Sequence, residues 1–175
     1  EAIKVLKVIE KKFDHSFVLN YSPFGAGAYF SDGAAFPEKT KKICDEADAI
    51  MKGPVGLAIE QMNTIPQEQR PEIAAILPIR KRYETFANYR PVRLPRELLS
   101  FSPIKPEILG NGLDILMIRE LLGGIYFGQK TEGSSTDMNY AKDECIYTEE
   151  EVTRVALVAF EEARKRKSGM TDIHK

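Results

Sequence analysis

Apolar residues recur along the chain at two spacings, and these spacings predict alternating helices and strands. Helical spacing predicts helices over residues 1–13, 37–47, 71–80 and 148–163. Short apolar runs predict strands at 17–19, 49–51 and 113–118, with a further strand over 170–175. This alternation is typical of βαβ units, so we expect an α/β fold with a mostly parallel sheet and flanking helices.

The stretch 113–128 carries the candidate chemistry. Its apolar strand ends at a charged pair, and in open α/β sheets ligands bind outside the carboxyl ends of the strands. Arg119, placed at such an end, could meet an anion. Gly123 and Gly124 allow the chain to turn and return as Ile-Tyr-Phe, so Tyr126 could face the same pocket as Arg119.

Composition limits the classes of partner. The 175 residues carry 25 basic and 26 acidic side chains, and the net charge of −1 gives no general attraction to nucleic acid or to a membrane surface. No apolar run approaches the length of a membrane span. Cys44 and Cys145 form neither a disulfide framework nor a metal-binding spacing, so a reducing cytoplasm is the simpler expectation.

The run Arg-Glu-Leu-x-Gly-Gly-Ile-Tyr-Phe-Gly at 119–128 resembles the signature of 3-isopropylmalate dehydrogenases. These belong to the wider β-decarboxylating dehydrogenase family, which includes isocitrate, homoisocitrate and tartrate/malate dehydrogenases. The sequence departs from the signature at Leu122, where the family usually has threonine. The resemblance implies an isopropylmalate dehydrogenase-like α/β fold.

A second block, Ile79 to Val92, resembles the family's Leu-Arg-Lys followed by Tyr/Phe-Ala-Asn-x-Arg-Pro. The resemblance makes Arg80, Arg90 and Arg119 the substrate-binding trio. Their chemistry suits a dicarboxylate, because planar guanidinium groups bind carboxylates bidentately. Without the resemblance, single arginines near helix ends would be interpreted as solvated charges. Three further arginines match no family position and are expected to be surface charges: Arg82, Arg93 and Arg96.

The segment before Arg80 is expected to contact the substrate side chain. By position in the family, Ile76 and Leu77 would form the apolar wall that recognises it, although their spacing alone favours ordinary core residues. In the family, the polar loop 60–69 approaches the nicotinamide cofactor. Here the loop is longer than usual, and Ile73 stands where the family has glutamate, so no cofactor-binding residue is assigned.

The resemblance also implies the catalytic pair. Lys175 aligns with the family lysine that reaches into the partner subunit's active site, and Tyr126 aligns with the tyrosine that acts with it in proton transfer. Burial beside other cations lowers the pKa of a lysine, which suits it to that task. His174 stands where isopropylmalate enzymes usually have aspartate and where the isocitrate and homoisocitrate branches often have histidine.

The domain organisation is likewise expected from the family. Residues 1–85 would be part of the first, larger α/β domain, and 86–175 a second domain that binds substrate and forms a homodimer with shared active sites. The family's first strand and its metal-binding aspartates lie outside this sequence, so we expect two incomplete domains of a longer enzyme. The aspartates that match no family metal ligand are Asp114, Asp137, Asp143 and Asp172.

Two motifs have simpler structural interpretations. Gly25-x-Gly27 could begin a phosphate-binding loop, but Phe30 stands where a third glycine belongs, so a structural turn is favoured. Lys165 to Lys167 could contact nucleic acid, but a helix that begins with the capping box at 148–151 would place them at its C-terminus, where basic residues stabilise the dipole.

The resemblance implies NAD-dependent oxidative decarboxylation of a 2-hydroxy dicarboxylate, assisted by Mg²⁺ or Mn²⁺ bound outside this sequence. The substrate favoured is 3-isopropylmalate, which places the enzyme in leucine biosynthesis and yields 2-oxoisocaproate. Homoisocitrate, isocitrate, tartrate and malate remain alternatives, as does NADP. A hypothesis of another class is a non-catalytic anion-binding or dimerising module.

Overall fold

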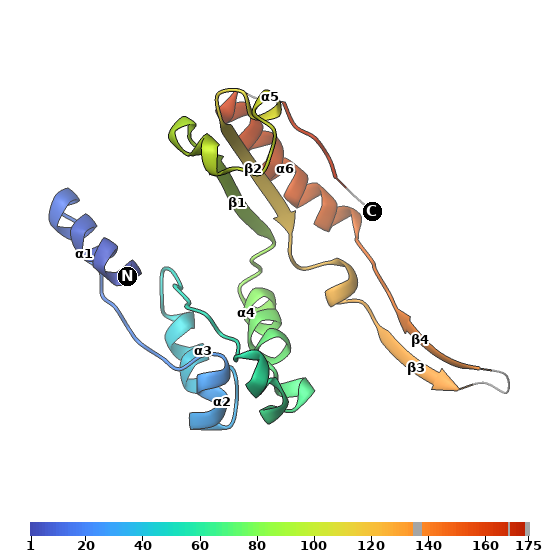
Figure 1. Cartoon of the computed structure of the whole chain (residues 1–175). Coiled ribbons are helices and arrows are strands. Elements are labelled where there is room, and N and C mark those ends of the chain that lie inside the picture. Colours follow the sequence, from blue (N-terminus) through green and yellow to red (C-terminus); the bar gives the residue numbers. More distant parts are fainter. Residues whose placement is uncertain (135–137, 168, 174–175) are drawn as a thin grey trace. The chain divides into compact units, whose positions relative to one another are not determined.

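The computed structural model describes residues 1–134, 138–167 and 169–173. The chain divides between Ile79 and Arg80 into two compact units. Helix α4, Leu77–Arg82, spans this division. The first unit is helical and the second combines helices with two small sheets (Figure 1).

The helices of the first unit follow the periodicity of the sequence. The three α-helices are α1 (Ala2–Phe13), α2 (Ala26–Asp32) and α3 (Glu38–Asp45). Three short helices follow: η1 (Ile59–Thr64), η2 (Gln67–Gln69) and η3 (Glu72–Ile76). The predicted helices at 1–13 and after Pro37 are therefore confirmed, and part of the predicted polar loop at 60–69 is helical.

The core of the first unit forms around α2. Its buried apolar residues are Ala26, Ala28, Ala35, Phe36, Ile65 and Ala75. Gly25 has φ 77°, and a Cβ at this position would approach Val55 to 2.8 Å. Glycine therefore allows the irregular segment at Val55 to pack against the start of α2. The Gly25 N–H donates to the Ala35 carbonyl at 2.8 Å. These contacts support the structural interpretation of the Gly-x-Gly motif.

A π-helical turn precedes α4. Pro78 lies within α4 and has no N–H to donate to the preceding turn. The wider turn of η3, in which each N–H bonds a carbonyl five residues back, ends just before it. We attribute this change of helical geometry to the proline.

The second unit is built on an antiparallel strand pair. Strand β1 (Ala87–Leu94) pairs with β2 (Leu113–Glu120), and α6 (Glu149–Arg166) packs on β2 (Figure 1). In sequence, the connection from β1 to β2 contains η4 (Arg96–Phe101) and α5 (Pro106–Leu109). After η5 (Gly124–Tyr126), a second antiparallel pair follows, β3 (Lys130–Ser134) with β4 (Asn139–Asp143).

Two sequence expectations about strands are wrong for the described residues. The apolar runs at 17–19 and 49–51 are irregular, and both sheets that the structure describes are antiparallel, not parallel. An apolar run becomes a strand only where a neighbour accepts and donates its backbone hydrogen bonds, and these two runs have no such neighbour in the described ranges. The strand over 113–118 is confirmed, but it is not the buried strand predicted: its residues are half-buried or exposed, with Ile115 and Met117 46% and 47% exposed.

Helix α6 begins and ends as its sequence predicts. The Thr148 hydroxyl accepts the Glu151 N–H at 3.2 Å, and the Glu151 carboxylate accepts the Thr148 N–H at 2.8 Å, which completes the capping box. Basic residues occupy the last turn, and Arg166 donates to Asp114 Oδ1 at 2.6 Å. The predicted strand over 170–175 is irregular at 170–173, and 174–175 lie outside the described residues.

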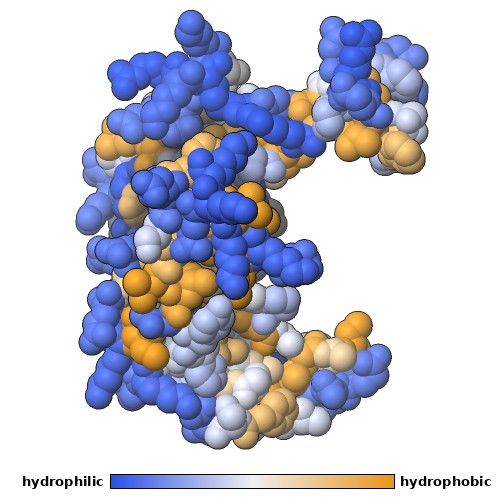
Figure 2. Space-filling model, turned by 90° about the vertical axis from the view of Figure 1, so that its left-hand side faces the viewer, coloured by the Kyte–Doolittle hydropathy of each residue, from blue (hydrophilic) through white to orange (hydrophobic). Residues whose placement is uncertain are grey.

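Much apolar surface remains exposed. The chain exposes 14044 Å², whereas two separate compact proteins of half its mass would together expose about 10,400 Å². Figure 2 shows apolar surface among the charged side chains. On α6, Val152, Leu157 and Phe160 are each more than half exposed. Among the described residues, no helix combines the length and the apolar character that crossing a membrane requires.

The glycine at 128 should contribute to the stability of the fold. A Cβ at this position would overlap the backbone carbonyl oxygen of Glu144, which is not free to move as a side chain is. We therefore expect Gly128→Ala to lower the free energy of unfolding by about 1 to 3 kcal/mol in denaturant titrations. Gly27→Ala is the matched control, because Gly27 lies in α2 with no atom within 4 Å of the added carbon, and it should stabilise the protein slightly. Equal stabilities for the two variants would contradict this packing.

Candidate functional site

Three elements of the second unit bring three arginines together. Arg80 lies on α4, Arg90 on β1 and Arg119 on β2. The strand register places Asn88 opposite Arg119, and Arg90 opposite Met117. Directly paired residues share a face of the sheet, as do residues two apart in one strand, so Arg90 and Arg119 are diagonal neighbours on the same face.

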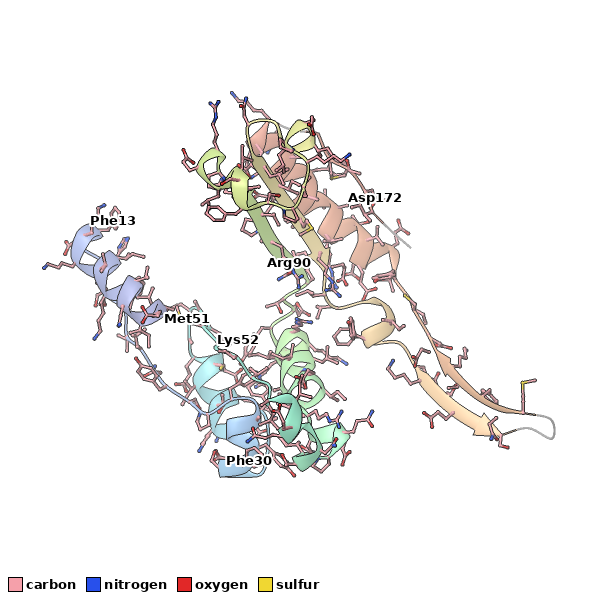
Figure 3. The ribbon with its side chains drawn as sticks, viewed as in Figure 1. Phe13, Phe30, Met51, Lys52, Arg90 and Asp172 are labelled. Carbon is pink, nitrogen blue, oxygen red and sulfur yellow. The ribbon has the colours of Figure 1, made fainter. Side chains whose placement is uncertain are left out.

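Backbone hydrogen bonds tie the ends of these elements to each other. The Thr85 N–H donates to the Arg80 carbonyl at 3.1 Å, and the Leu121 N–H donates to the Phe86 carbonyl at 2.8 Å. Within the sheet, Arg90 Nε donates to Asn88 Oδ1 at 2.5 Å, which orients one guanidinium (Figure 3 shows Arg90). The cluster is therefore positioned by secondary structure and not by a loop.

Arg80 lies in the electrostatic field of its neighbours. The pKa of Arg80 is lowered from its ordinary value, first by partial burial and then by the positive charges of Arg119 and Arg90. Tyr126 acts on Arg80 in the opposite direction. We call the three arginines Arg80, Arg90 and Arg119 the arginine cluster.

The cluster lacks a compensating carboxylate. Within the described ranges, none of Arg80, Arg90 and Arg119 forms an ion pair with Asp or Glu. Other arginines of the same unit do, since Arg93 lies 3.4 Å from Asp114 and Arg154 lies 3.2 Å from Glu120. Three close, uncompensated guanidinium groups are arranged to bind a multivalent anion.

Tyr126 lies beside the cluster, as the sequence predicted. The Arg119 Cζ is 6.0 Å from the centroid of the Tyr126 ring. Gly124 begins η5 with φ 77°, and its N–H donates to the Ile146 carbonyl at 2.8 Å. Any Cβ at Gly124 would overlap the Tyr147 hydroxyl, so this glycine allows the turn that returns Tyr126 to Arg119.

The remaining residues predicted from the sequence belong to the first unit or lie outside the described residues. Ile76 and Leu77 are half-buried in the first unit, at the end of η3 and the start of α4. Lys175 lies outside the described residues. Asp114, which was not assigned to a metal, pairs with Arg93 and Arg166.

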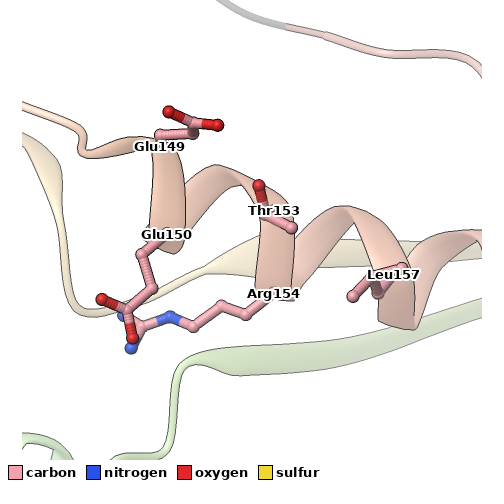
Figure 4. A pocket seen from close by; sticks show the side chains of 5 residues that line it. All are labelled: Glu149, Glu150, Thr153, Arg154 and Leu157. Carbon is pink, nitrogen blue, oxygen red and sulfur yellow. The ribbon is translucent and has the colours of Figure 1, made fainter.

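No residue of this chain is assigned to a metal ion. In the part of the chain that the structure describes, no three or more side chains among His, Cys, Asp and Glu come together in a way that could hold one. The described residues of the second unit do contain a hollow of about 500 Å³ on α6 (Figure 4). Its lining residues are Glu149, Glu150, Thr153, Arg154 and Leu157. The hollow shares no residue with the arginine cluster, and its two glutamates make it unsuitable for an anion.

Sequence reasoning missed two residues that support the cluster. Asn88 orients Arg90, and the spacing of two within a strand could have indicated this contact. Arg154 on α6 bonds to Glu120, the neighbour of Arg119 in sequence. No local pattern indicates that second contact, because it depends on how α6 packs on β2.

Comparison with known proteins shows which family the sequence matches. The family model for isocitrate/isopropylmalate dehydrogenases matches residues 1–175. The chain is 42% identical over 167 residues to 3-isopropylmalate dehydrogenase of Campylobacter jejuni (strain RM1221), covering 95% of this chain and 45% of that protein. It is 40% identical over 175 residues to 3-isopropylmalate dehydrogenase of Thermotoga maritima, covering 48% of that protein.

A solved structure shares the fold. The crystal structure of isocitrate dehydrogenase from Methylococcus capsulatus matches with a TM-score of 0.69 at 18% identity, covering 93% of this chain and 43% of that chain. At this identity the match shows the fold alone. The chain thus spans about half the length of the curated relatives that it matches.

Partial burial of the charged Arg80, together with repulsion from Arg119 and Arg90, should reduce stability. Because the pKa of Arg80 is lowered, the folded state binds this proton less tightly than the unfolded state, so the charged side chain destabilises the fold at every pH below that pKa. Arg80→Met, which retains the aliphatic bulk, should raise the free energy of unfolding by up to about 1 kcal/mol at low ionic strength. The gain should shrink in about 1 M salt, where charges are screened within a few ångströms.

The control for this measurement is Arg93→Met. Arg93 is exposed and paired with Asp114, so its loss should leave stability unchanged or slightly lower. A loss of stability in Arg80→Met that exceeds that of Arg93→Met at low salt would show that the cluster is not under repulsion.

Proposed function

The chain belongs to the isocitrate/isopropylmalate dehydrogenase family, and from that premise we propose that it forms the substrate-anion site of an NAD-dependent β-decarboxylating dehydrogenase. The substrate is a 2-hydroxy dicarboxylate, and 3-isopropylmalate is the member we favour. The relatives named as 3-isopropylmalate dehydrogenases, at about 40% identity, support this choice. The product would be 2-oxoisocaproate, and the role leucine biosynthesis.

The observation that carries this proposal is the uncompensated arginine cluster. A 2-hydroxy dicarboxylate brings two negative charges to three guanidinium groups that have no carboxylate partner within the described residues. Binding would relieve the repulsion among Arg80, Arg90 and Arg119. The face shared by Arg90 and Arg119 would fix the orientation of the carboxylates, because a guanidinium fork binds both oxygens of a carboxylate.

Tyr126 is the residue we assign to proton transfer. Its hydroxyl belongs to a half-exposed side chain beside Arg119, where it could reach a bound substrate. NAD, when bound, would supply the hydride acceptor: the hydroxyl-bearing carbon would lose hydride and its hydroxyl would lose a proton to a basic group. The carboxylate β to the resulting ketone would then leave as carbon dioxide. Tyr126 would donate a proton to the carbon left by decarboxylation, and Lys175 of a partner subunit would assist. A bound Mg²⁺ or Mn²⁺ would supply charge stabilisation of the enolate.

Substrate choice would depend on the residues just ahead of Arg80. Ile76 and Leu77 are apolar and half-buried, which suits recognition of an isopropyl group. A substrate with a third carboxylate, such as isocitrate or homoisocitrate, would need a polar or charged group in place of this wall. We therefore rank those substrates, and tartrate and malate, below 3-isopropylmalate.

A homodimer with shared active sites is part of the proposal. The exposed apolar residues Val152, Leu157 and Phe160 on α6 suit contact with a second copy. The β3–β4 pair leaves two strand edges available for contact with another chain. Two cysteines in unrelated contexts support a cytoplasmic location.

The direct test is NAD reduction by the full-length reading frame that contains these residues. It should be assayed with magnesium and, separately, 3-isopropylmalate, homoisocitrate, isocitrate, malate and tartrate. We expect the highest kcat/KM with 3-isopropylmalate. Preference for homoisocitrate or isocitrate would correct the substrate within the family. Anion binding without oxidation of any of the five would instead favour a non-catalytic anion-binding or dimerising module.

Arg119→Lys should damage substrate use and spare the cofactor. A lysine ammonium retains the charge but cannot form the bidentate fork, so kcat/KM for the dicarboxylate should fall about ten- to a hundredfold while the KM for NAD changes little. Arg93→Lys on the same sheet is the matched control and should be neutral. Unchanged turnover in Arg119→Lys would remove Arg119 from the site.

Tyr126→Phe separates chemistry from binding. The ring and its contact with Arg119 remain, and only the hydroxyl is lost. We expect kcat to fall by about a hundredfold or more, with a smaller change in KM. The opposite pattern, a raised KM with kcat maintained, would make Tyr126 a binding residue.

A further inference from the structure

Glu120 is turned away from the arginine cluster, although it follows Arg119 directly. Successive strand residues point to opposite faces, so Arg119 is exposed while the side chain of Glu120 is only 10% exposed. Its Oε2 accepts the N–H groups of Leu122 and Gly123 at 2.8 and 2.7 Å. The carboxylate thus closes the turn that leads from Arg119 to Tyr126.

Arg154 holds that carboxylate from α6. Its Nη2 donates to Glu120 Oε1 at 3.2 Å, and its Cζ lies 5.0 Å from the centroid of the Phe86 ring. Figure 4 shows the Arg154 side chain extending away from the helix. One guanidinium therefore contacts the end of β2 and the residue just before β1.

The contacts of Arg154 with Glu120 and Phe86 involve residues close in sequence to the three arginines. Phe86 lies between Arg80 and Arg90 in sequence, and its carbonyl accepts the Leu121 N–H at 2.8 Å. Glu120 lies between Arg119 and the turn. Movement of the Arg154 guanidinium would consequently disturb the chain segments that carry all three arginines.

The ion pair between Arg154 and Glu120 is not optimised for stability alone. Arg154 Nε is buried without a hydrogen-bond partner among the described residues. An unsatisfied buried N–H costs free energy, and partly buried ion pairs are often no more stable than apolar replacements. A partly buried arginine kept at such a cost is better explained by the geometry it imposes on the turn.

We propose that Arg154 and Glu120 are positioning residues for the arginine cluster: their bond fixes the 120–124 turn and so sets the placement of Tyr126 against Arg119. Because Glu120 is fully engaged by Arg154 and the two backbone N–H groups, it is also kept from neutralising Arg119. The role in turnover rests on the function proposed above, whereas the role in shaping the turn does not.

The chain offers a matched control for this proposal. Arg166 also joins α6 to β2, donating to the Asp114 carbonyl at 2.9 Å and to its Oδ1 at 2.6 Å, at the opposite end of both elements. Arg154→Gln and Arg166→Gln each remove one arginine bridge between the same helix and strand. A purely structural tether would make the two variants behave alike.

Two measurements on the full-length protein decide the matter. In Arg154→Gln, hydrogen exchange of a peptide covering 120–128 should accelerate, because the Leu122 and Gly123 amides lose a fixed acceptor, and KM for the dicarboxylate should rise by about tenfold with KM for NAD within twofold. Arg166→Gln should change neither quantity. If Arg154→Gln does not fold, Arg154→Lys, which keeps the cation but not the planar contact with Phe86, carries the same measurements.

The outcomes separate this proposal from the proposed function. If exchange in 120–128 is unchanged by Arg154→Gln, or if both variants alter exchange and KM equally, the positioning role is overturned. If the unsubstituted protein oxidises none of the candidate dicarboxylates, the proposed function fails, and the exchange comparison still decides whether Arg154 shapes the turn.

Discussion

The gathering of three guanidinium groups on one helix and two paired strands is the constraint on which the proposed site depends. Partial burial, followed by the charges of Arg119 and Arg90, lowers the pKa of Arg80. A protein gains nothing in stability from such an arrangement. It persists because backbone hydrogen bonds and the register of β1 with β2 hold the arginines in place, and because a bound dianion would reverse the sign of the interaction.

Packing around the turn after β2 explains why the signature at 119–128 contains three glycines. Glycines at 123, 124 and 128 leave room for Tyr147, Glu151 and the backbone of Glu144, so the chain can fold tightly after β2. Helix α6 lies against this turn and contributes Arg154 to it. The helix proposed to meet a second subunit is therefore also the helix that supports the arginine cluster, so our proposals assign dimer formation and support of the anion site to one element.

The sequence predicted those features that are encoded locally. Periodic apolar residues and a capping box predicted α1, α3 and α6. The resemblance of the blocks at 79–92 and 119–128 to family motifs pointed to Arg80, Arg90, Arg119 and Tyr126, which the structure brings together. Sequence reasoning missed β1, which contains Pro91, and the polar strands β3 and β4, because neither has the apolar character of a typical strand. It also missed Arg154 and Glu120 as partners, because 34 residues separate them and only tertiary packing joins them.

The central claim is that the arginine cluster is a dianion site, and equilibrium binding tests it most directly. Titration calorimetry on the full-length protein should compare 3-isopropylmalate with 2-hydroxyisocaproate, which lacks the second carboxylate, at several salt concentrations. We predict that the dicarboxylate binds at least about tenfold more tightly and that this advantage shrinks as salt screens the charges. Equal affinities for the two acids, or an advantage that salt does not reduce, would contradict the account.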